Sequence, residues 1–368
     1  MSKSKILFIL HYPPPIHGSS IVGKQIVDCE IINNTFSCEY VNLTTSYDVD
    51  EIGKLGLIKY IRLLKIYLVV LFKLITHRYD LCYLAITVTK GGILKDSPLV
   101  FLCKVFGRKV IIHQHNKGVS LFQNIKLFDV IYKLVYRNVK VILLSWYLYP
   151  DVSKYVNKKD VFICPNGVKP NNKVTSDKLV NKVPQILFVS NLIESKGCYI
   201  LLEACKILKD KGLSFNCNFV GAATKAISKE EFIEQIDLRG LSKNVFYLGP
   251  KYGEEKNAIF EKSDIFVFST SYHKECLPLV LLEAMQFSLP VISTFEGGIP
   301  DVVEDNVTGF LVPGKEAVAL AEKLEILISN PELCKKMGKA GNQKYLNSFT
   351  LEHFEKNIFN ILQDSIQS

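Results

Sequence analysis

The chain has 368 residues, of which 48% are hydrophobic and 22% charged, and it carries a formal net charge of +9. This length exceeds what one hydrophobic core ordinarily supports, so we expect two domains, and the composition excludes a long disordered tract. Ten cysteines stand singly, without the paired spacing of a zinc site or a redox dithiol, and this pattern favours a reducing, cytoplasmic compartment.

The first half of the sequence alternates short apolar runs with segments of helical periodicity, as in a parallel sheet covered on both faces. Residues 5–10 form the first predicted strand, because this run is too short for a signal-peptide core and leads directly into three prolines. Further strands are predicted near 38–42, 80–85, 109–113, 140–144 and 160–164, and helices over 18–32, 55–77, 96–106, 121–138 and 147–157.

The second half repeats this alternation after an irregular segment rich in proline, asparagine and charge. Strands are predicted near 185–190, 215–221, 245–248, 264–268 and 290–293, helices over 197–210, 228–239, 253–262 and 278–287, and two or three more helices between 315 and 365. The predicted fold class is α/β, with two tandem doubly wound Rossmann-like domains facing a cleft. The predicted divisions are a first domain at 1–165, a linker at 166–184, a second domain at 185–345, and a C-terminal helix within 346–368 that packs back toward the first domain.

The excess positive charge lies entirely in the first half of the chain. Residues 1–165 contain 22 Lys+Arg against 11 Asp+Glu, a net of +11, and the remainder has a net of −2. Because no zinc-finger spacing or RNA-binding aromatic motif accompanies this charge, we expect no nucleic-acid partner. The segment 55–78 combines bulky apolar residues with lysines and arginines, which predicts a helix on an anionic membrane surface. A long helix that only packs on the sheet is the alternative.

The stretch 271–312 holds the residues that point most directly to chemistry. A predicted strand leads into a loop that contains Glu275, and Pro278 can occupy the first turn of the next helix, where a missing N–H costs nothing. The amides of Leu279 and Val280 would then point into the cleft. Since a helix N-terminus attracts anions, this segment predicts a site for a diphosphate.

Glu283 lies eight residues after Glu275, further along the same predicted helix. One carboxylate could therefore meet a sugar at the loop while the other meets a ribose. In a purely structural interpretation, Glu283 is an exposed helix carboxylate and Glu275 is a favourable charge near the start of the helix dipole.

This pattern, followed by PVIST and GGIPDVV, resembles the E-x7-E donor site of retaining GT-B glycosyltransferases of family 4, in a subgroup that builds bacterial surface polysaccharides. The resemblance covers nearly the whole chain, with PPPIHGSS at 13–20, HQH at 113–115, PNGV at 165–168, SNLIESKG at 190–197, VGAA at 220–223 and LGP at 248–250. It implies that Glu275 faces the donor sugar and that Glu283 binds the ribose hydroxyls. It also implies that the segment of Leu277, Pro278, Leu279 and Val280 holds the phosphate and sugar.

The resemblance gives roles to four further residues. Lys196 would neutralise the diphosphate leaving group, and Asn191 stands where the family often has an arginine, so one positive charge of the expected clamp is missing. Gly18 stands where the family has a glycine-rich loop that approaches the donor. His115 begins the loop after the strand 109–113 and would lie near the transferred sugar and the acceptor, whereas His113 is the less favoured histidine. Without the motifs, each of these would be taken for an ordinary surface or turn residue.

Two other patterns are set aside. Asp48 and Asp50 form a D-x-D sequence that metal-dependent transferases of another fold use, but a three-residue match is weak. No G-x-G-x-x-G follows the first strand, which argues against a nicotinamide enzyme. We therefore expect no metal ion and no cofactor, with the nucleotide sugar acting as a substrate.

The expected activity is transfer of a hexose or N-acetylhexosamine, with retention of configuration, from a nucleotide sugar to a saccharide acceptor. The donor is expected to be a UDP-sugar and the acceptor to be linked to polyprenyl diphosphate, in the synthesis of capsule, O-antigen or exopolysaccharide. The expected location is the cytoplasmic face of the cell membrane, as a peripheral protein. Two alternatives stay open: a sugar-nucleotide 2-epimerase, and a subunit that binds nucleotide sugar without catalysis.

Overall fold

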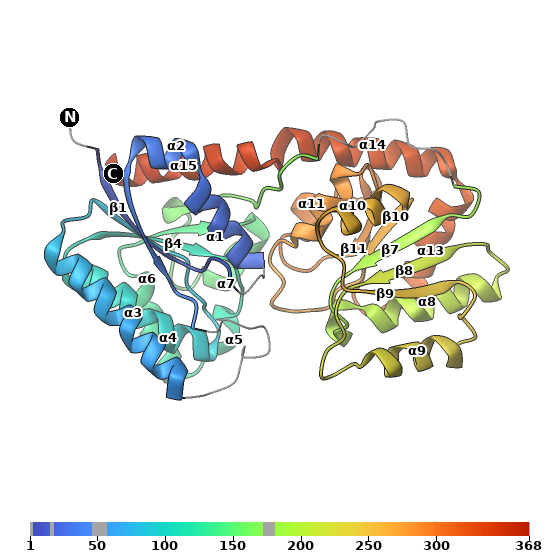
Figure 1. Ribbon diagram of the computed structural model, residues 1–368, viewed down its shortest axis with the longest axis horizontal. Coiled ribbons are helices and arrows are strands. Elements are labelled where there is room, and N and C mark those ends of the chain that lie inside the picture. The colour runs from blue at the N-terminus through green and yellow to red at the C-terminus, as the bar shows by residue number, and fades with distance from the viewer. Residues whose placement is uncertain (1–2, 15–17, 46–56, 172–180, 368) are drawn as a thin grey trace. The chain divides into compact units, whose positions relative to one another are not determined.

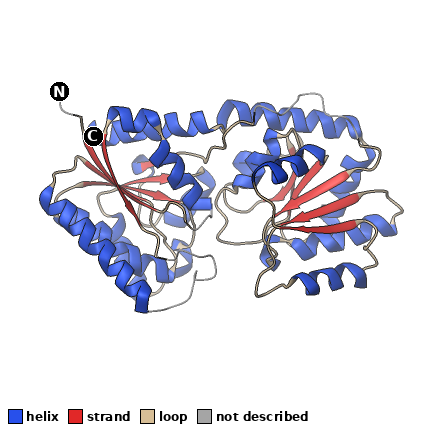
Figure 2. Cartoon of the chain, in the orientation of Figure 1, coloured by secondary structure: helices blue, strands red, loops and turns tan. Residues whose placement is uncertain are grey.

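A computed structural model describes residues 3–14, 18–45, 57–171 and 181–367. The chain divides into two compact units, one made of Met1–Gly167 with Leu351–Ser368 and the other of Val168–Thr350. Each unit contains a six-stranded sheet with helices around it (Figures 1 and 2). The predicted α/β class with two tandem Rossmann-like domains is confirmed.

The sheet of the first unit is parallel throughout, with the strand order β2-β1-β3-β4-β5-β6. Its strands are β1 (Lys5–Leu10), β2 (Ser37–Asn42), β3 (Leu81–Leu84), β4 (Lys109–Gln114), β5 (Lys140–Leu143) and β6 (Val161–Ile163). Its helices are α1 (Gly18–Asp28), α2 (Glu30–Thr35), α3 (Leu57–Thr76), α4 (Lys90–Val105), α5 (Val119–Phe122), α6 (Lys126–Tyr136), α7 (Tyr149–Val152) and α15 (Leu351–Gln367).

Alternate side chains of β1 pack to opposite faces of this sheet. Ile6, Phe8 and Leu10 join one core with residues of α1, α2 and the C-terminal helix α15, which include Ile26 and Ile358. Leu7 and Ile9 are equally inaccessible. Burial on both sides explains why the sequence of this strand is apolar without alternation.

The sheet of the second unit is also parallel, with the order β12-β11-β10-β7-β8-β9. Its strands are β7 (Gln185–Val189), β8 (Asn216–Val220), β9 (Val245–Gly249), β10 (Ile265–Phe268), β11 (Val291–Thr294) and β12 (Gly309–Val312). Its helices are α8 (Cys198–Asp210), α9 (Lys229–Leu238), α10 (Gly253–Lys262), α11 (Leu279–Gln286), α12 (Ile299–Val302), α13 (Ala317–Ser329) and α14 (Pro331–Ser348).

Several predicted elements need correction. The strand β12 was missed, because a four-residue run after a turn gives almost no periodic signal. The predicted helix 18–32 is interrupted at Cys29, whose extended backbone separates α1 from α2. The predicted helix 147–157 ends early as α7, and α4 begins at Lys90 rather than at residue 96. The second unit begins at Val168, within the range 166–184 predicted for the linker, and residues 172–180 of that range lie outside the described residues.

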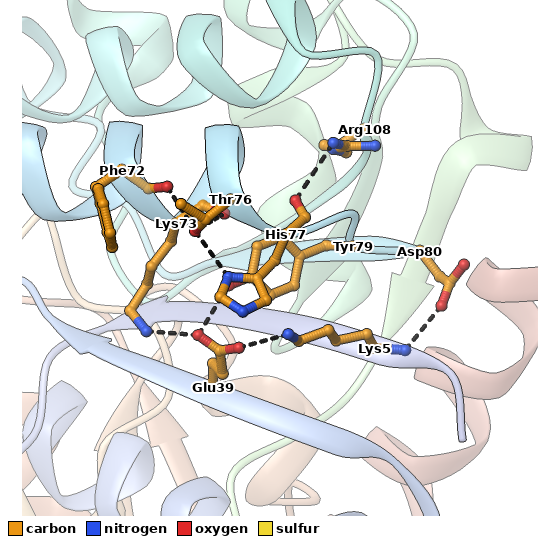
Figure 3. A network of polar contacts seen from close by, with 9 residues as sticks. All are labelled: Lys5, Glu39, Phe72, Lys73, Thr76, His77, Tyr79, Asp80 and Arg108. Carbon is orange, nitrogen blue, oxygen red and sulfur yellow. Dashed lines mark hydrogen bonds and ion pairs between the residues drawn. The ribbon is translucent and has the colours of Figure 1, made fainter. Parts of the chain in front are cut away.

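A charged cluster joins β2 to α3 in the first unit (Figure 3). The Glu39 carboxylate accepts from the Lys5 ammonium at 2.8 Å, from the Lys73 ammonium at 2.5 Å and from the Tyr79 hydroxyl at 2.8 Å. Burial opposes ionisation of Glu39, but these three donors outweigh it and lower the pKa of this carboxyl to about 2. The cluster therefore ties α3 to the edge of the sheet through an ionised carboxylate.

Replacing Glu39 by glutamine should destabilise the first unit by about 1–3 kcal/mol at neutral pH, since two ammonium groups lose their counter-charge. Because the folded-state pKa is lower than the ordinary value, this stabilisation is complete above about pH 5 and is lost as the pH falls toward 2. Urea unfolding of the wild-type chain and of Glu39→Gln should therefore show a difference in the free energy of unfolding that shrinks as the pH is lowered between these values. Asp28→Asn, which breaks the exposed Lys24–Asp28 pair, is the control and should cost well under 1 kcal/mol.

The outward face of α3 is apolar. Ile66, Val70 and Leu74 point into the unit and are buried. The opposite face exposes at least half of each of seven large apolar side chains: Leu57, Ile58, Ile61, Leu64, Leu68, Phe72 and Ile75. We call these seven residues the α3 apolar face. Within the described chain, no helix is long and apolar enough to cross a membrane.

The cations of α3 lie mostly away from this face. Lys73 pairs with Glu39, and the Arg62 guanidinium donates to the Thr45 carbonyl at 3.0 Å. Lys59 is partly buried, whereas Lys65 is exposed. At least two of the four cations of α3 therefore serve contacts within the unit.

Candidate functional site

The carboxyl ends of β7 and β10 meet at the turn that carries Lys196. Lys196 ends a short 3-10 turn after β7, and Gly197 then adopts a φ of 89° at the start of α8. A side chain at Gly197 would overlap the backbone of Ser269, and the Ser271 amide donates to the Ser195 carbonyl at 2.7 Å. Glycine at this position therefore allows the Lys196 turn to pack directly against the end of β10.

Lys196 and Glu275 form an ion pair at this edge of the second sheet. Both side chains are largely buried, with 18% and 11% of their surfaces exposed. The Lys196 ammonium also lies 4.6 Å from the centroid of the Tyr272 ring, within range of a cation–π interaction. The structure thus brings together the two residues that the sequence assigned to the leaving group and to the donor sugar.

Tyr272 was not singled out from the sequence. Burial and the adjacent Glu275 carboxylate raise its pKa, so its phenol stays protonated at neutral pH. The Glu275 amide donates to the Tyr272 carbonyl at 2.8 Å, which closes a tight turn just before the glutamate. Tyr272 therefore contacts both charged residues of the pair.

The loop of Glu275 is supported from below by two glycines that follow β11. Gly297 has a φ of 56°, and a side chain there would lie 2.7 Å from the Cys276 carbonyl oxygen and closer still to that of Glu275. The Gly298 amide donates to the Cys276 carbonyl at 2.6 Å. The two glycines of the GGIPDVV motif therefore have local roles: Gly297 leaves no room for a side chain against the Glu275 loop, and Gly298 holds that loop through its amide.

Gly297→Ala should displace the Glu275 loop. The unfolding free energy should fall by about 1–3 kcal/mol, and turnover should fall further than the loss of stability accounts for. Gly212→Ala is the matched control, because Gly212 also has a positive φ, 77°, but open space around it. Thermal unfolding and turnover of both variants test this prediction. If Gly297→Ala and Gly212→Ala lost stability and turnover to the same extent, the contact between Gly297 and the Glu275 loop would have no role in function.

The segment before α11 differs slightly from the prediction. Pro278 is the N-cap of the helix rather than part of its first turn, with a ψ of 123°, and α11 begins at Leu279. The Leu281 amide donates to the Pro278 carbonyl at 3.2 Å. By ordinary helix geometry, the amides of Leu279 and Val280 lie at the end that lacks intrahelical acceptors. Leu277 is buried and anchors the segment.

Glu283 lies on α11 and pairs with Lys256 of α10. The Lys256 ammonium donates to both carboxylate oxygens, at 2.7 and 2.9 Å. Sequence reasoning missed Lys256, because nothing in the sequence links the first turn of one helix to the middle of the next. Each of the two glutamates of the E-x7-E pattern therefore faces one lysine.

Asn191 has a structural contact instead of a charge. Its side-chain oxygen accepts from the Ala222 amide at 3.2 Å, and the Leu192 amide donates to the Ala222 carbonyl at 2.8 Å. Gly221 lies so close to the Ser190 carbonyl that a side chain would overlap it. Asn191 thus joins the loops that follow β7 and β8.

In the first unit, Gly18 begins α1 and is exposed, and a side chain there would meet no atom of the described residues within 4 Å. The rest of its loop, 15–17, lies outside the described residues. Gly23 is more constrained, because a side chain there would overlap the His11 carbonyl. The local structure therefore explains the glycine at 23 but does not require one at 18.

The two histidines at the end of β4 are in contact, with ring centroids 4.0 Å apart. His113 is fully buried, and its Nδ1 lies 2.5 Å from the Tyr83 hydroxyl. Burial and the neighbouring His115 hold the pKa of His113 well below its usual range, so this ring is neutral. His115 follows the strand and is partly exposed, so it is the histidine that a substrate could reach.

Asp151 of α7 holds the loop that follows His115. Its carboxylate accepts from the amides of Gly118, Val119 and Ser120 at 2.9, 3.1 and 3.0 Å. The Ser120 hydroxyl adds a bond at 2.6 Å. Sequence reasoning missed this residue, because an aspartate in a short helix carries no motif. Asp151 is a candidate positioning residue for the His115 loop.

No cluster of three or more His, Cys, Asp or Glu side chains that could hold a metal ion occurs among the described residues. Asp48 and Asp50 lie outside them. Around Lys196, Glu275 and Glu283 the second unit presents carboxylates, ammonium groups and backbone amides, which suit a phosphorylated sugar by hydrogen bonding and charge.

The chain is similar to known proteins in sequence and in fold. Residues 171–344, just under half of the chain, match the family model described as "Glycosyl transferases group 1". The capsular polysaccharide biosynthesis glycosyltransferase CapM of Staphylococcus aureus is 30% identical over 49% of this chain and 46% of its own length. A Campylobacter jejuni protein is 27% identical over 54% of this chain and 53% of its own length, and it is named GalNAc-alpha-(1->4)-GalNAc-alpha-(1->3)-diNAcBac-PP-undecaprenol alpha-1,4-N-acetyl-D-galactosaminyltransferase. The chain thus spans about half the length of the curated relatives it matches.

Solved structures match over almost the entire chain. A glycosyltransferase from Rickettsia africae has a TM-score of 0.78 at 17% identity and covers 100% of both chains. HepE from Anabaena, in complex with UDP and glucose, has a TM-score of 0.72 at 17% identity and covers 98% of this chain and 99% of its own. The group 1 family model and the named polysaccharide glycosyltransferases support the resemblance to glycosyltransferases that the motifs indicate. The chain has the GT-B fold of two Rossmann-like domains, and its residues 171–344 match the group 1 glycosyltransferases.

Proposed function

We propose that this chain is a glycosyltransferase that moves a sugar from a nucleotide sugar to a saccharide acceptor. The observation that carries the proposal is the Lys196–Glu275 ion pair beside the start of α11. Glu275 stands eight residues before Glu283, which lies on α11. This arrangement places a cation, helix amides and two carboxylates on the segment that matches the group 1 model. The proposal extends to retention of configuration and to family 4, on the strength of the E-x7-E pattern.

In the proposed reaction, Lys196 and the amides of Leu279 and Val280 bind the diphosphate of the donor. As the bond between the sugar carbon and the diphosphate oxygen breaks, these groups stabilise the charge that develops on the leaving group. Glu275 faces the donor sugar and fixes its position. Glu283 accepts hydrogen bonds from the ribose hydroxyls.

The acceptor hydroxyl attacks the same face of the sugar carbon from which the diphosphate departs. A bond forms between the acceptor oxygen and that carbon, and the hydroxyl proton passes to the leaving diphosphate. His115 is proposed to contact the transferred sugar and the acceptor. The reaction needs no metal in this proposal, because the positive groups of the chain supply the charge.

The proposed donor is a UDP-sugar carrying a hexose or N-acetylhexosamine, since HepE binds UDP in the same fold. The proposed acceptor is a saccharide on polyprenyl diphosphate, as the name of the Campylobacter jejuni relative states for that protein. The product would enter a bacterial surface polysaccharide, in keeping with the name of CapM.

We also propose that residues 55–78 hold the chain on the cytoplasmic face of a membrane. The α3 apolar face supports this, because seven exposed large apolar side chains on one helix are costly in water. The segment 57–78 has no acidic residue, so an anionic lipid surface meets no repulsion there. With at least two cations turned inward, insertion of apolar side chains should contribute more than charge.

A thermal-shift screen of nucleoside diphosphates and nucleotide sugars tests the proposed function. A ligand at about 100 times its dissociation constant should stabilise the chain by about 2.7 kcal/mol. The donor that binds is then incubated with and without candidate saccharide acceptors. Transfer that requires an acceptor supports the proposal, whereas conversion of the donor sugar without one would show a 2-epimerase, and binding without either would show a non-catalytic subunit.

A further inference from the structure

Lys256 lies outside the recognised motifs and contacts the proposed donor site through Glu283. It lies in the first turn of α10, and its ammonium contacts both oxygens of Glu283. About a quarter of each side chain is exposed, 24% for Lys256 and 22% for Glu283. The pair is therefore accessible enough to meet a ligand and buried enough to be held in one geometry.

The geometry of this pair determines what Glu283 can do. A glutamate side chain has three rotatable bonds, and a bond from one ammonium to both of its oxygens fixes the plane of the carboxylate. An ionised carboxylate has about four acceptor positions, of which Lys256 occupies two, one on each oxygen. One position on each oxygen is left, which suits two neighbouring hydroxyl groups of one ligand.

We propose that Lys256 is a positioning residue that prepares Glu283 to accept from the 2′- and 3′-hydroxyls of a ribonucleotide. This inference rests on the proposed function and adds the residue that determines selectivity for ribose over 2′-deoxyribose. Without Lys256, the Glu283 carboxylate rotates freely, and fixing its orientation when a ribose binds costs a part of the binding free energy. The loss falls on the hydroxyl contacts and not on the diphosphate.

The test compares binding of UDP and of 2′-deoxy-UDP by calorimetry. The wild-type chain should bind UDP roughly tenfold or more tightly than 2′-deoxy-UDP, as expected for hydrogen bonds to a charged acceptor. Lys256→Met should weaken the binding of UDP several-fold to roughly tenfold and the binding of 2′-deoxy-UDP much less. The preference for UDP over 2′-deoxy-UDP should therefore shrink. Lys256→Arg should restore a part of it. Lys262→Met, an exposed lysine in the last turn of the same helix, is the matched control and should change neither affinity.

Glu283→Gln and the Lys256→Met, Glu283→Gln double variant complete the cycle. Because Lys256 acts through Glu283, the double variant should bind UDP no more weakly than Glu283→Gln alone. The inference is overturned if Lys256→Met weakens both nucleotides by the same factor, or weakens neither, while the wild-type chain prefers UDP. A wild-type chain that does not bind UDP would instead overturn the proposed donor, so the two failures are distinguishable.

Discussion

Glu275→Gln is expected to lower kcat at least about a hundredfold, the usual cost of removing one group that acts on the transition state. Glutamine keeps the shape of the side chain but removes the charge that pairs with Lys196 and that is proposed to face the donor sugar. Because Lys196 and the amides of α11 remain, UDP should still bind. The effect is measured as the rate of turnover of the donor found in the nucleotide-sugar screen. This rate is monitored through the release of nucleoside diphosphate.

Glu322→Gln, an exposed glutamate on α13, is the control for this experiment and should leave turnover unchanged. A thermal unfolding curve of Glu275→Gln separates loss of activity from loss of fold. Full activity in Glu275→Gln, with the wild-type KM, would show that the donor sugar does not meet this carboxylate.

Replacing Leu64, Leu68 and Phe72 by serine is expected to remove binding to lipid vesicles. These residues lie on the α3 apolar face with 57%, 55% and 66% of their surfaces exposed, so the fold should tolerate the change. Each apolar side chain transferred from water to lipid contributes about 1.5–3 kcal/mol, so the three together should lower binding by a factor of about a thousand or more. Vesicle co-sedimentation of both proteins measures this loss.

Salt and lipid charge should have smaller effects on the same binding. Lys65, the exposed cation of α3, should contribute about 1 kcal/mol with anionic lipid, so Lys65→Gln should weaken binding by only about fivefold. Leu238→Ser, at a 71% exposed leucine of the second unit, is the matched control. Binding that high salt abolishes would show that charge holds the chain on the membrane; wild-type binding by the triple variant would contradict the proposed surface.

The sequence predicted the fold and the two glutamates because both leave local signals. Buried parallel strands are continuous apolar runs, and for that reason all eleven predicted strands match β1 to β11 to within a few residues, whereas β12 was missed. The spacing of Glu275 and Glu283 is likewise local, since one short helix carries the second glutamate and the preceding loop carries the first.

Orientation and pairing could not be predicted in the same way. In α3, Ile66, Val70 and Leu74 repeat every four residues, but so do Leu64, Leu68 and Phe72. Hydropathy alone cannot tell which of two apolar stripes meets the sheet, and the direction of the lysines depends on that choice. The Lys256–Glu283 and Asp151–Ser120 contacts join segments 27 and 31 residues apart and leave no local pattern.

A crystal structure of the chain with a bound UDP-sugar tests the central claim most directly. The proposed function predicts the diphosphate against Lys196 and the amides of Leu279 and Val280, the sugar beside Glu275, and the ribose hydroxyls on Glu283. A donor bound at another place in the second unit, or one whose diphosphate contacts neither Lys196 nor the start of α11, would contradict it.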